Sequence, residues 1–439
     1  RQGTGTLTLK DKSSLTSKAV LVAGSEVNSV GNLIAQGQSS LQLDEIIIGD
    51  QGTGNLNIES GSSVTVDKNT ILGRNVSSTA NIIVDGADSV LNSNGEYLGI
   101  ADNGKANVTV RNKGKINANT TVIGNNLGST GILTVSGTGT EIASDNIVVG
   151  GAGRGTLNIN NGGTVKTGSI SSLAGRSNST VNFNGGILEL SEVQPQLFEG
   201  FTSASKINLG TGGGTINTAG FNTRLFENTT LAGSGAVITG AGDFAKEGTG
   251  LLAMATTAKQ WTGATNINQG TLRLDGNYTM RDGEILGIGL NTLEDYGQLV
   301  VQGRANISQG QLEVNASEAV ANLSGNNEWK DIVKATTRVG EFTKISDNSP
   351  LVSFYADYSD PNAVHLKMDA PTPPVVTPEP PVVTPEPPVV TPEPPVVTPE
   401  PPVVTPEPPV VTPEPPVTDT TFVESVNTQS QRNDVGIAY

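Results

Sequence analysis

Short apolar bursts, separated by polar and glycine-rich turns, recur along the first 190 residues. Each first burst ends on a glycine, and these glycines lie 24 to 26 residues apart at Gly24, Gly49, Gly73, Gly99, Gly124, Gly150 and Gly175. A polar loop follows, then a second burst such as Asn55–Ile58 and a third, shorter one such as Val64–Val66. The pattern predicts three short strands in each repeat of about 25 residues.

A period of this length is typical of a solenoid or a propeller. A propeller blade needs four antiparallel strands in about 40 residues, and leucine-rich repeat spacing is absent. The sequence therefore predicts an all-β, right-handed parallel β-helix of about 15 coils spaced about 4.8 Å apart. Leu56 and Ile58 should point inward and Asn55 and Asn57 outward. Outward Asn and Thr residues should form hydrogen-bonded ladders along the stack.

Composition and charge fit thin layers with a polar surface. Only 35% of the 439 residues are apolar and 4% aromatic, which is too little for a thick globular core. The formal net charge of −16 argues against a nucleic-acid partner, because phosphate binding needs clustered positive charge. The sequence has no cysteine. That absence suits a chain threaded unfolded into an oxidising compartment.

The regular period fades beyond Leu190, but a glycine-punctuated motif continues in region 191–276. Its elements are Lys246, Gly248, Gly250, Leu251, Leu252, Trp261, Thr262, Gly263, Ile267, Gly270, Thr271, Leu272 and Leu274. This stretch closely resembles the passenger-associated repeat of bacterial autotransporters. It departs from that pattern at Glu247, where threonine is usual, and in "LAMATTAKQW" (252–261). The resemblance implies that the β-helix of residues 1–190 continues through 276.

Region 277–370 resembles the C-terminal part of a pertactin-like passenger. In that family this part caps the β-helix and acts as an autochaperone during secretion. The aromatic residues gathered here fit a denser core, namely Trp329, Phe342, Phe354, Tyr355 and Tyr358. The repeated "PPVVTPE" of 371–416 predicts an extended, semi-rigid spacer. Residues 417–439 weakly resemble the segment that precedes a translocating barrel, which would lie outside this sequence.

The search for chemistry predicts no enzyme, no metal site and no cofactor. His365 is the single histidine, and neither "GDSG" nor G-x-S-x-G occurs, which argues against a serine-protease passenger. Metal ligation by cysteine or several histidines is excluded by count. Polysaccharide lyases and hydrolases also use parallel β-helices, so a glycan-processing enzyme stays as an alternative.

The loops after the burst-ending glycines are the most polar and variable part of the repeat. In a parallel β-helix they should stack into one column along the axis. The candidate binding residues in these loops are Asp50, Arg74, Asn75, Asp102, Asn103, Asn125, Asn126, Arg154 and Arg176. Such a column could pair with an antiparallel copy of itself, giving weak and multivalent contacts. The alternative is that these loops are only solvated corners.

The resemblance implies a secreted autotransporter passenger of the AIDA type or pertactin type, exported through the periplasm to the bacterial cell surface or outer membrane, with release as a further possibility. The expected function is adhesion through a repetitive polar face. The expected partner is the same passenger on a neighbouring cell, or a host matrix protein or glycan. Membrane attachment would come only through a C-terminal β-barrel outside this sequence. The alternative is a passive stalk that displays an upstream binding region.

Overall fold

The computed structural model describes residues 3–173, 179–227 and 235–369. Strands make up 60% of the structure and helices 2%. The prediction of an all-β protein is therefore confirmed. The proline-rich repeat of 371–416 and the segment 417–439 lie outside the described residues.

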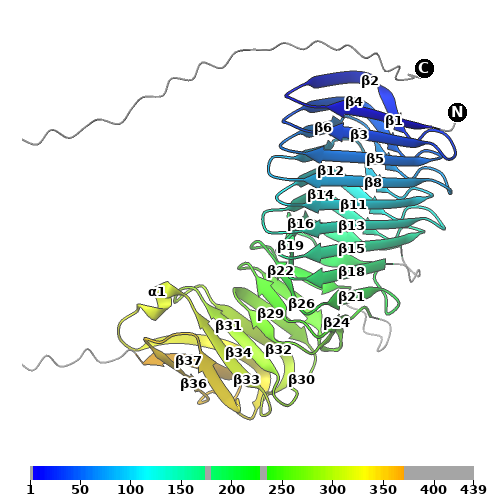
Figure 1. The fold of residues 1–439 in the computed structure, drawn as a ribbon. Helices are drawn as coiled ribbons and strands as arrows, with labels where there is room; N and C mark the ends of the chain where they lie inside the picture. The colour runs from blue at the N-terminus through cyan, green and yellow to red at the C-terminus, as the bar shows by residue number, and fades with distance from the viewer. Residues whose placement is uncertain (1–2, 174–178, 228–234, 370–439) are drawn as a thin grey trace, which may run out of the picture. The chain divides into compact units, whose positions relative to one another are not determined.

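Equivalent strands of successive turns pair parallel and in register, which makes the fold a parallel β-helix (Figure 1). For example, β5 (Thr53–Glu59) pairs with β8 (Thr79–Asp85), so that Leu56 lies beside Ile82. Between these two strands the chain passes through β6 (Ser63–Val66) and β7 (Thr70–Leu72), which pair into a second sheet. Each such turn thus contains the three short strands that the sequence pattern predicts.

The first sheet takes one strand from each turn. Its eleven strands in the described residues are β1 (Thr4–Leu9), β3 (Val30–Ala35), β5, β8, β11 (Lys105–Arg111), β13 (Thr130–Ser136), β15 (Arg154–Asn160), β18 (Ser179–Asn184), β21 (Lys206–Leu209), β24 (Ile238–Gly240) and β27 (Lys259–Trp261).

The second sheet takes the other two strands of each turn, which in four turns join into one longer strand. Through residue 275 its strands are β2 (Ser14–Ala23), β4 (Ser40–Ile48), β6, β7, β9 (Val90–Ser93), β10 (Leu98–Ile100), β12 (Lys115–Ile123), β14 (Glu141–Val149), β16 (Thr164–Thr167), β17 (Ser169–Ser171), β19 (Gly186–Leu190), β20 (Gln196–Glu199), β22 (Gly214–Asn217), β23 (Thr223–Phe226), β25 (Phe244–Glu247), β26 (Leu251–Ala255), β28 (Thr265–Ile267) and β29 (Gly270–Asp275).

The core is a narrow column of aliphatic side chains enclosed by the two sheets. In β5 the inward Leu56 and Ile58 have no exposed surface, whereas Asn55 and Asn57 between them are partly exposed. One turn contributes only a few such side chains, each stabilising the fold by about 1.5–3 kcal/mol when fully buried. They are buried largely because the turns above and below cover them, so the apolar pattern must recur at every turn.

Outward asparagines form the expected ladders between turns. Asn55 Nδ2 donates to Asn32 Oδ1 at 2.8 Å, and Asn81 Nδ2 donates to Asn55 Oδ1 at 2.9 Å. A second ladder begins further along, where Asn182 Nδ2 donates to Asn158 Oδ1 at 2.9 Å. The predicted polar ladders are therefore confirmed. Because an amide both donates and accepts, one residue type can satisfy both neighbouring turns.

Glycine occupies most of the corners where the second sheet gives way to the first. Gly49 and Gly124 have φ values of 72° each, in the left-handed region. A Cβ atom on Gly124 would lie 2.2 Å from the carbonyl oxygen of Arg154, one turn further on. Both the backbone conformation and the close stacking of turns therefore exclude a side chain at Gly124.

One corner differs from the sequence-based assignment. Gly99 lies inside β10, paired with Ile71, and the corner residue equivalent to Gly73 is Ala101 with a φ of 65°. A Cβ atom on Gly99 would meet the ring of Tyr97 at 2.7 Å. The glycine in "EYLG" thus makes room for a neighbouring side chain rather than for the corner. Gly175, assigned to a later corner, lies outside the described residues.

The β-helix has about 12 turns of roughly 26 residues, fewer than the 15 expected. Later turns are uneven in length, since Ile207 pairs with Ile238, which follows it by 31 residues (238 − 207), and Ile238 pairs with Lys259, which follows it by 21 (259 − 238). The last strands depart from parallel pairing: β34 (Asn327–Val339) still pairs parallel with β32, but β37 (Ala363–Asp369) pairs antiparallel with β34 and with β36 (Ser353–Asp357). Fewer residues therefore remain for coils.

The C-terminal part of the stack packs its aromatics inside. It contains β30 (Tyr278–Thr279), β31 (Ile285–Leu290), β32 (Gly297–Asn306), β33 (Gln311–Ala316), α1 (Glu318–Ala321), β34, β35 (Lys344–Asp347), β36 and β37, after the 3-10 turn Thr256–Ala258. Parallel pairing continues as far as β35 on β33. Trp329 is fully buried, with its ring 5.7 Å from that of Phe354. The aromatic residues Phe342 and Phe354 are buried, whereas Tyr355 is 43% exposed.

Lys246 is buried in the core of the stack, at the lysine of the glycine-punctuated motif. Its Nζ donates to the carbonyl oxygens of Glu247 at 2.8 Å, Gly248 at 2.5 Å and Gln269 at 3.0 Å. Burial lowers the pKa of Lys246 from 10.5 to about 7. The side chain therefore satisfies three carbonyl groups at a turn, at the cost of desolvating an amine.

Gly124→Ala should lower the free energy of unfolding by about 2–4 kcal/mol, because a clash with the Arg154 carbonyl adds to the strain of a positive φ. Gly128→Ala is the matched control. Its φ is 90°, but a Cβ atom there would meet nothing within 4 Å, so we expect a loss of only about 1 kcal/mol. Urea unfolding followed by circular dichroism measures both, and equal losses would show that turn stacking does not require Gly124.

Lys246→Met should lower stability by leaving three carbonyl groups without a donor, and the loss should grow as pH rises from 7 to about 10. The folded pKa of about 7 lies below the unfolded value of 10.5. Between these values the unfolded chain holds a proton that the folded chain releases, so the wild-type unfolding free energy rises with pH. We expect roughly 1 kcal/mol per pH unit relative to the variant. A pH-independent difference in urea unfolding would contradict the assignment of a desolvated amine.

Candidate functional site

The first six connections from the second sheet back to the first lie along one edge, which we call the corner edge. They span residues 24–29, 49–52, 73–78, 101–104, 124–129 and 150–153, between the strands that flank them. Within these six, six-residue and four-residue connections alternate; the alternation ends there, since the later connection 200–205 again has six residues where four would be expected. The repeat of this edge is therefore two turns, not one.

Asp50 is the first polar centre of the corner edge. Arg74 Nε donates to Asp50 Oδ1 at 2.7 Å, and Asn75 Nδ2 donates to the same oxygen at 2.8 Å. Asn75 Nδ2 also reaches the Asp50 carbonyl oxygen at 2.9 Å. Asp50 is only 7% exposed, whereas Arg74 is exposed. The carboxylate therefore ties two successive connections together from within.

Asp102 repeats this arrangement two turns further on. Asn125 Nδ2 donates to Asp102 Oδ1 at 2.7 Å, and Asn126 Nδ2 reaches it at 3.2 Å. Asn103 Nδ2 donates to Asp102 Oδ2 at 3.1 Å and to the carbonyl oxygen of Arg74 at 2.8 Å. The structure thus brings the candidate residues from Asp50 to Asn126 together in one hydrogen-bonded column.

Two candidate residues differ from this column. Arg154 is the first residue of β15, in register with Thr130 of the preceding turn, and not part of its connection. The connection itself, 150–153, is Gly-Gly-Ala-Gly and offers no polar side chain. Arg154 is exposed beside the column. Arg176 lies outside the described residues.

A buried serine closes each long connection. Ser78 Oγ donates to the Asn75 carbonyl oxygen at 2.6 Å, and Ser129 Oγ donates to that of Asn126 at 2.7 Å. In these turns the next connection is short and carries glycine. A Cβ atom on Gly104 would lie 2.5 Å from the Ser78 carbonyl oxygen, and one on Gly153 would lie 2.1 Å from Ser129 Oγ. Each long connection therefore occupies the space that a side chain in the next connection would need.

The long connections carry exposed aliphatic side chains at their tips. Val27 is 50% exposed, Val76 82% and Leu127 75%, and each is the fourth residue of its six-residue connection. Strands of a parallel β-helix lie about 4.8 Å apart, so these tips are spaced by about 10 Å along the axis. The sequence analysis missed them. The signal was present in the alternating loop lengths, but it was obscured by placing a corner at Gly99.

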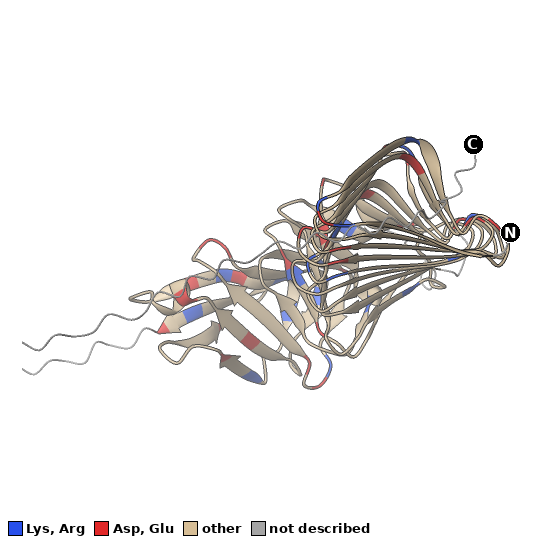
Figure 2. Cartoon of the chain, turned by 45° about the horizontal axis from the view of Figure 1, so that its top comes forward, with Lys and Arg blue, Asp and Glu red and all other residues tan. Residues whose placement is uncertain are grey.

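The sign of the exposed charges beside the tips changes from one end of the corner edge to the other. Figure 2 shows that Lys, Arg, Asp and Glu leave most of the broad sheets uncoloured and lie largely in turns and at strand ends. On the corner edge the exposed Glu26 lies in the first connection, whereas the exposed Lys105 and Arg154 follow the fourth and sixth. The first end of the edge is therefore acidic and the other end basic.

The corner edge carries apolar, amide and charged side chains rather than a cluster of metal ligands. In the described residues, no group of three or more His, Cys, Asp and Glu side chains is placed to hold a metal ion. His365 lies in β37, as its alternating sequence predicts, and its Nδ1 accepts a hydrogen bond from the Asp331 N–H at 3.0 Å. What the edge offers is a periodic set of apolar tips, amides and charges.

Comparison with known proteins adds no relative. No protein-family model matches this chain, and no curated protein matches it significantly. Helices in the described residues are all too short to span a membrane. The class of protein that the structure defines is the parallel β-helix.

Asp102→Ala should lower the free energy of unfolding by roughly 1 kcal/mol, because three partly exposed amides lose their acceptor. Asp145→Ala is the matched control, since Asp145 is also an acidic residue of the stack but is exposed. We expect it to change stability by less than about 0.5 kcal/mol. Urea unfolding measures both values. Equal effects would mean that the Asp102 column does not hold the connections together.

Proposed function

We propose that this chain is the passenger of a bacterial autotransporter and acts at the cell surface as an adhesin that binds a second copy of itself. The resemblance of Lys246–Leu274 to the passenger-associated repeat supports the secretion class. The corner edge supports the binding mode, and one observation carries it: long, apolar-tipped connections alternate with short, glycine-bearing ones.

The alternation of long and short connections makes the corner edge of one copy complementary in shape to that of a second copy. Two copies related by a two-fold axis perpendicular to the stack run antiparallel. If the axis passes between the third and fourth connections, the first faces the sixth, the third faces the fourth and the fifth faces the second. Every long connection then faces a short one. Val27, Val76 and Leu127 of each copy each enter a gap that the other copy leaves open.

Charge fits the same arrangement. The first connection of one copy, with Glu26, faces the sixth connection of the other, beside which Arg154 lies. The acidic end of one edge therefore meets the basic end of its partner, and this occurs twice in the pair. Solvent-exposed pairs of this kind contribute at most about 1 kcal/mol each, but they fix the register and orientation of the copies.

The expected affinity of one pair of copies is low. Covering one exposed Val or Leu tip stabilises the pair by about 1 kcal/mol, so the six tips contribute a few kcal/mol. Loss of translational and rotational freedom costs about 4–15 kcal/mol. Stable adhesion therefore requires many copies acting together on apposed surfaces, where effective concentration is high.

Val27→Ser, Val76→Ser and Leu127→Ser combined should abolish aggregation of cells that display the chain, because the tips no longer exclude water from the gaps. Val193→Ser, Leu293→Ser and Leu351→Ser form the matched control, since these residues are also 43–67% exposed but lie away from the corner edge. Sedimentation of displaying cells gives the readout, with surface level and circular dichroism unchanged. Aggregation that survives the first triple variant excludes this edge.

A charge exchange tests the antiparallel register. Cells with Glu26→Arg and cells with Arg154→Glu should each aggregate poorly, because like charges then meet at both ends of the pair. Mixed together they should aggregate again, since the introduced arginine of one cell type meets the introduced glutamate of the other. Failure of the mixture to recover would indicate another register or a different partner. Absence of aggregation by the wild-type chain itself, despite correct display, would favour the stalk or a host-matrix ligand.

A further inference from the structure

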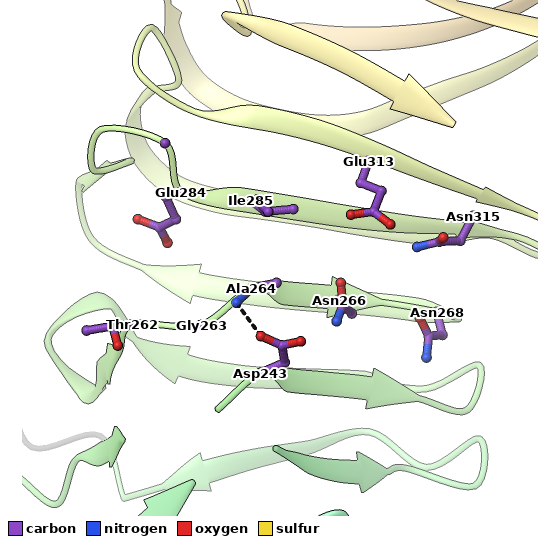
Figure 3. Close-up of a pocket in the computed structure, with 11 residues that line it drawn as sticks. Asp243, Thr262, Gly263, Ala264, Asn266, Asn268, Glu284, Ile285, Glu313 and Asn315 are labelled. Atoms are coloured by element: carbon purple, nitrogen blue, oxygen red, sulfur yellow. Dashed lines mark hydrogen bonds between the residues drawn. The ribbon is translucent and has the colours of Figure 1, made fainter. Parts of the chain in front are cut away.

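A polar trough crosses the outer face of the second sheet in its later turns, away from the corner edge. Its floor is β31, where Gly287 and Gly289 point outward and have no side chain. A cavity of about 470 Å³ opens here (Figure 3). A second cavity of about 380 Å³ shares Asn268 and Asn315 with the first, so the two form one continuous groove along β31.

Polar side chains face one another across this floor. Asn266 and Glu313 are both in register with Gly287, on the strands either side of it, and Figure 3 shows them directed toward β31. Strand spacing sets their backbones about 10 Å apart. A Cβ atom on Gly287 would lie 2.2 Å from Asn266 Oδ1. The glycine therefore lets the Asn266 amide lean over the floor.

The glycine at Gly289 is equally constrained. A Cβ atom there would lie 2.5 Å from the Asn268 carbonyl oxygen. Asn268 and Asn315 flank this position, and Asp243 closes the end of the groove, where its Oδ1 accepts a hydrogen bond from the Ala264 N–H at 2.8 Å. The groove thus has a flat peptide floor and walls of amides and carboxylates.

The lining selects among ligand classes. Among the described residues, neither cavity is lined by Lys or Arg, whereas Asp243, Glu247 and Glu313 line the groove, so anions are repelled. The amides of four asparagines, Asn266, Asn268, Asn291 and Asn315, both donate and accept, which matches ligands whose groups do the same. A peptide strand could not add here, because the backbone of β31 already pairs with β28 and β33.

We propose that this groove binds an uncharged or amino-substituted oligosaccharide that lies along β31. Hydroxyl groups on both edges of the sugar rings meet Asn266 and Asn268 on one wall and Glu313 and Asn315 on the other, while the rings rest on the glycine floor. This site is separate from the corner edge and gives the chain a second kind of ligand. Binding rests on hydrogen bonds in a water-exposed groove, so the affinity of one site is low.

The test uses the full chain and hexasaccharides of four kinds: a neutral glucose polymer, N-acetylglucosamine, glucosamine and galacturonate. Saturation-transfer NMR and calorimetry should show binding of at least one of the first three and exclusion of galacturonate. Asn266→Ala, Glu313→Ala and Asn315→Ala combined should weaken that binding at least tenfold. Thr215→Ala, in the same outward row two strands before Asn266, should leave it unchanged.

Further measurements distinguish saccharide binding in the groove from charge effects, from binding at the corner edge and from cation binding. Glu313→Gln keeps an acceptor and removes a charge, so it should retain the neutral ligand and bind galacturonate more tightly than wild type does. Cell aggregation should be unaffected by every groove variant, which distinguishes this site from the corner edge. The proposal is overturned if none of the three saccharides binds, if the triple variant binds as wild type, if galacturonate alone binds, or if only Ca²⁺ added without saccharide gives a signal lost in the triple variant.

Discussion

In-register parallel pairing of each strand with its equivalent one turn away is the constraint on which the rest of the structure depends. It fixes the spacing of turns at about 4.8 Å, which is the contact distance for stacked side chains. Leu56 therefore packs on Ile82, and Asn55 bonds Asn81, without any further design. The same spacing makes corners so crowded that Gly49 and Gly124 cannot carry a Cβ atom. Core, ladders and corners are three consequences of one geometry.

The sequence predicts those consequences because each leaves a periodic mark. Alternating Val, Ile and Leu identify the inward face, and recurring glycines identify most corners. The mark fails at Gly99, because glycine there relieves contact with the Tyr97 ring while Ala101 adopts the left-handed conformation. A recurring glycine indicates a position without room for a Cβ atom. It does not indicate whether a backbone corner or a neighbouring side chain occupies that room. The number of turns was overestimated for a related reason: antiparallel pairing of β37 replaces coils without changing the local strand pattern.

The sequence predicts where the candidate site lies, but it does not predict which side chains project from it. Stacking places Asp50, Asn75, Asp102 and Asn125 together, as the repeat predicts, yet their side chains are largely engaged with one another. The side chains that project are the aliphatic tips, and their positions depend on the length of each connection. A long connection closed by Ser78 leaves no space for a side chain at Gly104, and the connection that contains Gly104 is short. This two-turn alternation depends on packing between loops of neighbouring turns. An alignment with a period of one turn does not show it.

The apolar tips are not required by that packing. Val76 leaves 82% of its surface exposed, and the serine that closes its loop acts through Ser78 Oγ and backbone atoms rather than through Val76. A single exposed aliphatic is ordinary in a soluble protein. Three at equivalent positions, two turns apart, on an otherwise polar edge are a repeating feature that folding alone does not explain. The contact surface that we propose would explain it, because such a surface excludes water at regular intervals, and the two-turn period matches a two-fold-related, antiparallel copy.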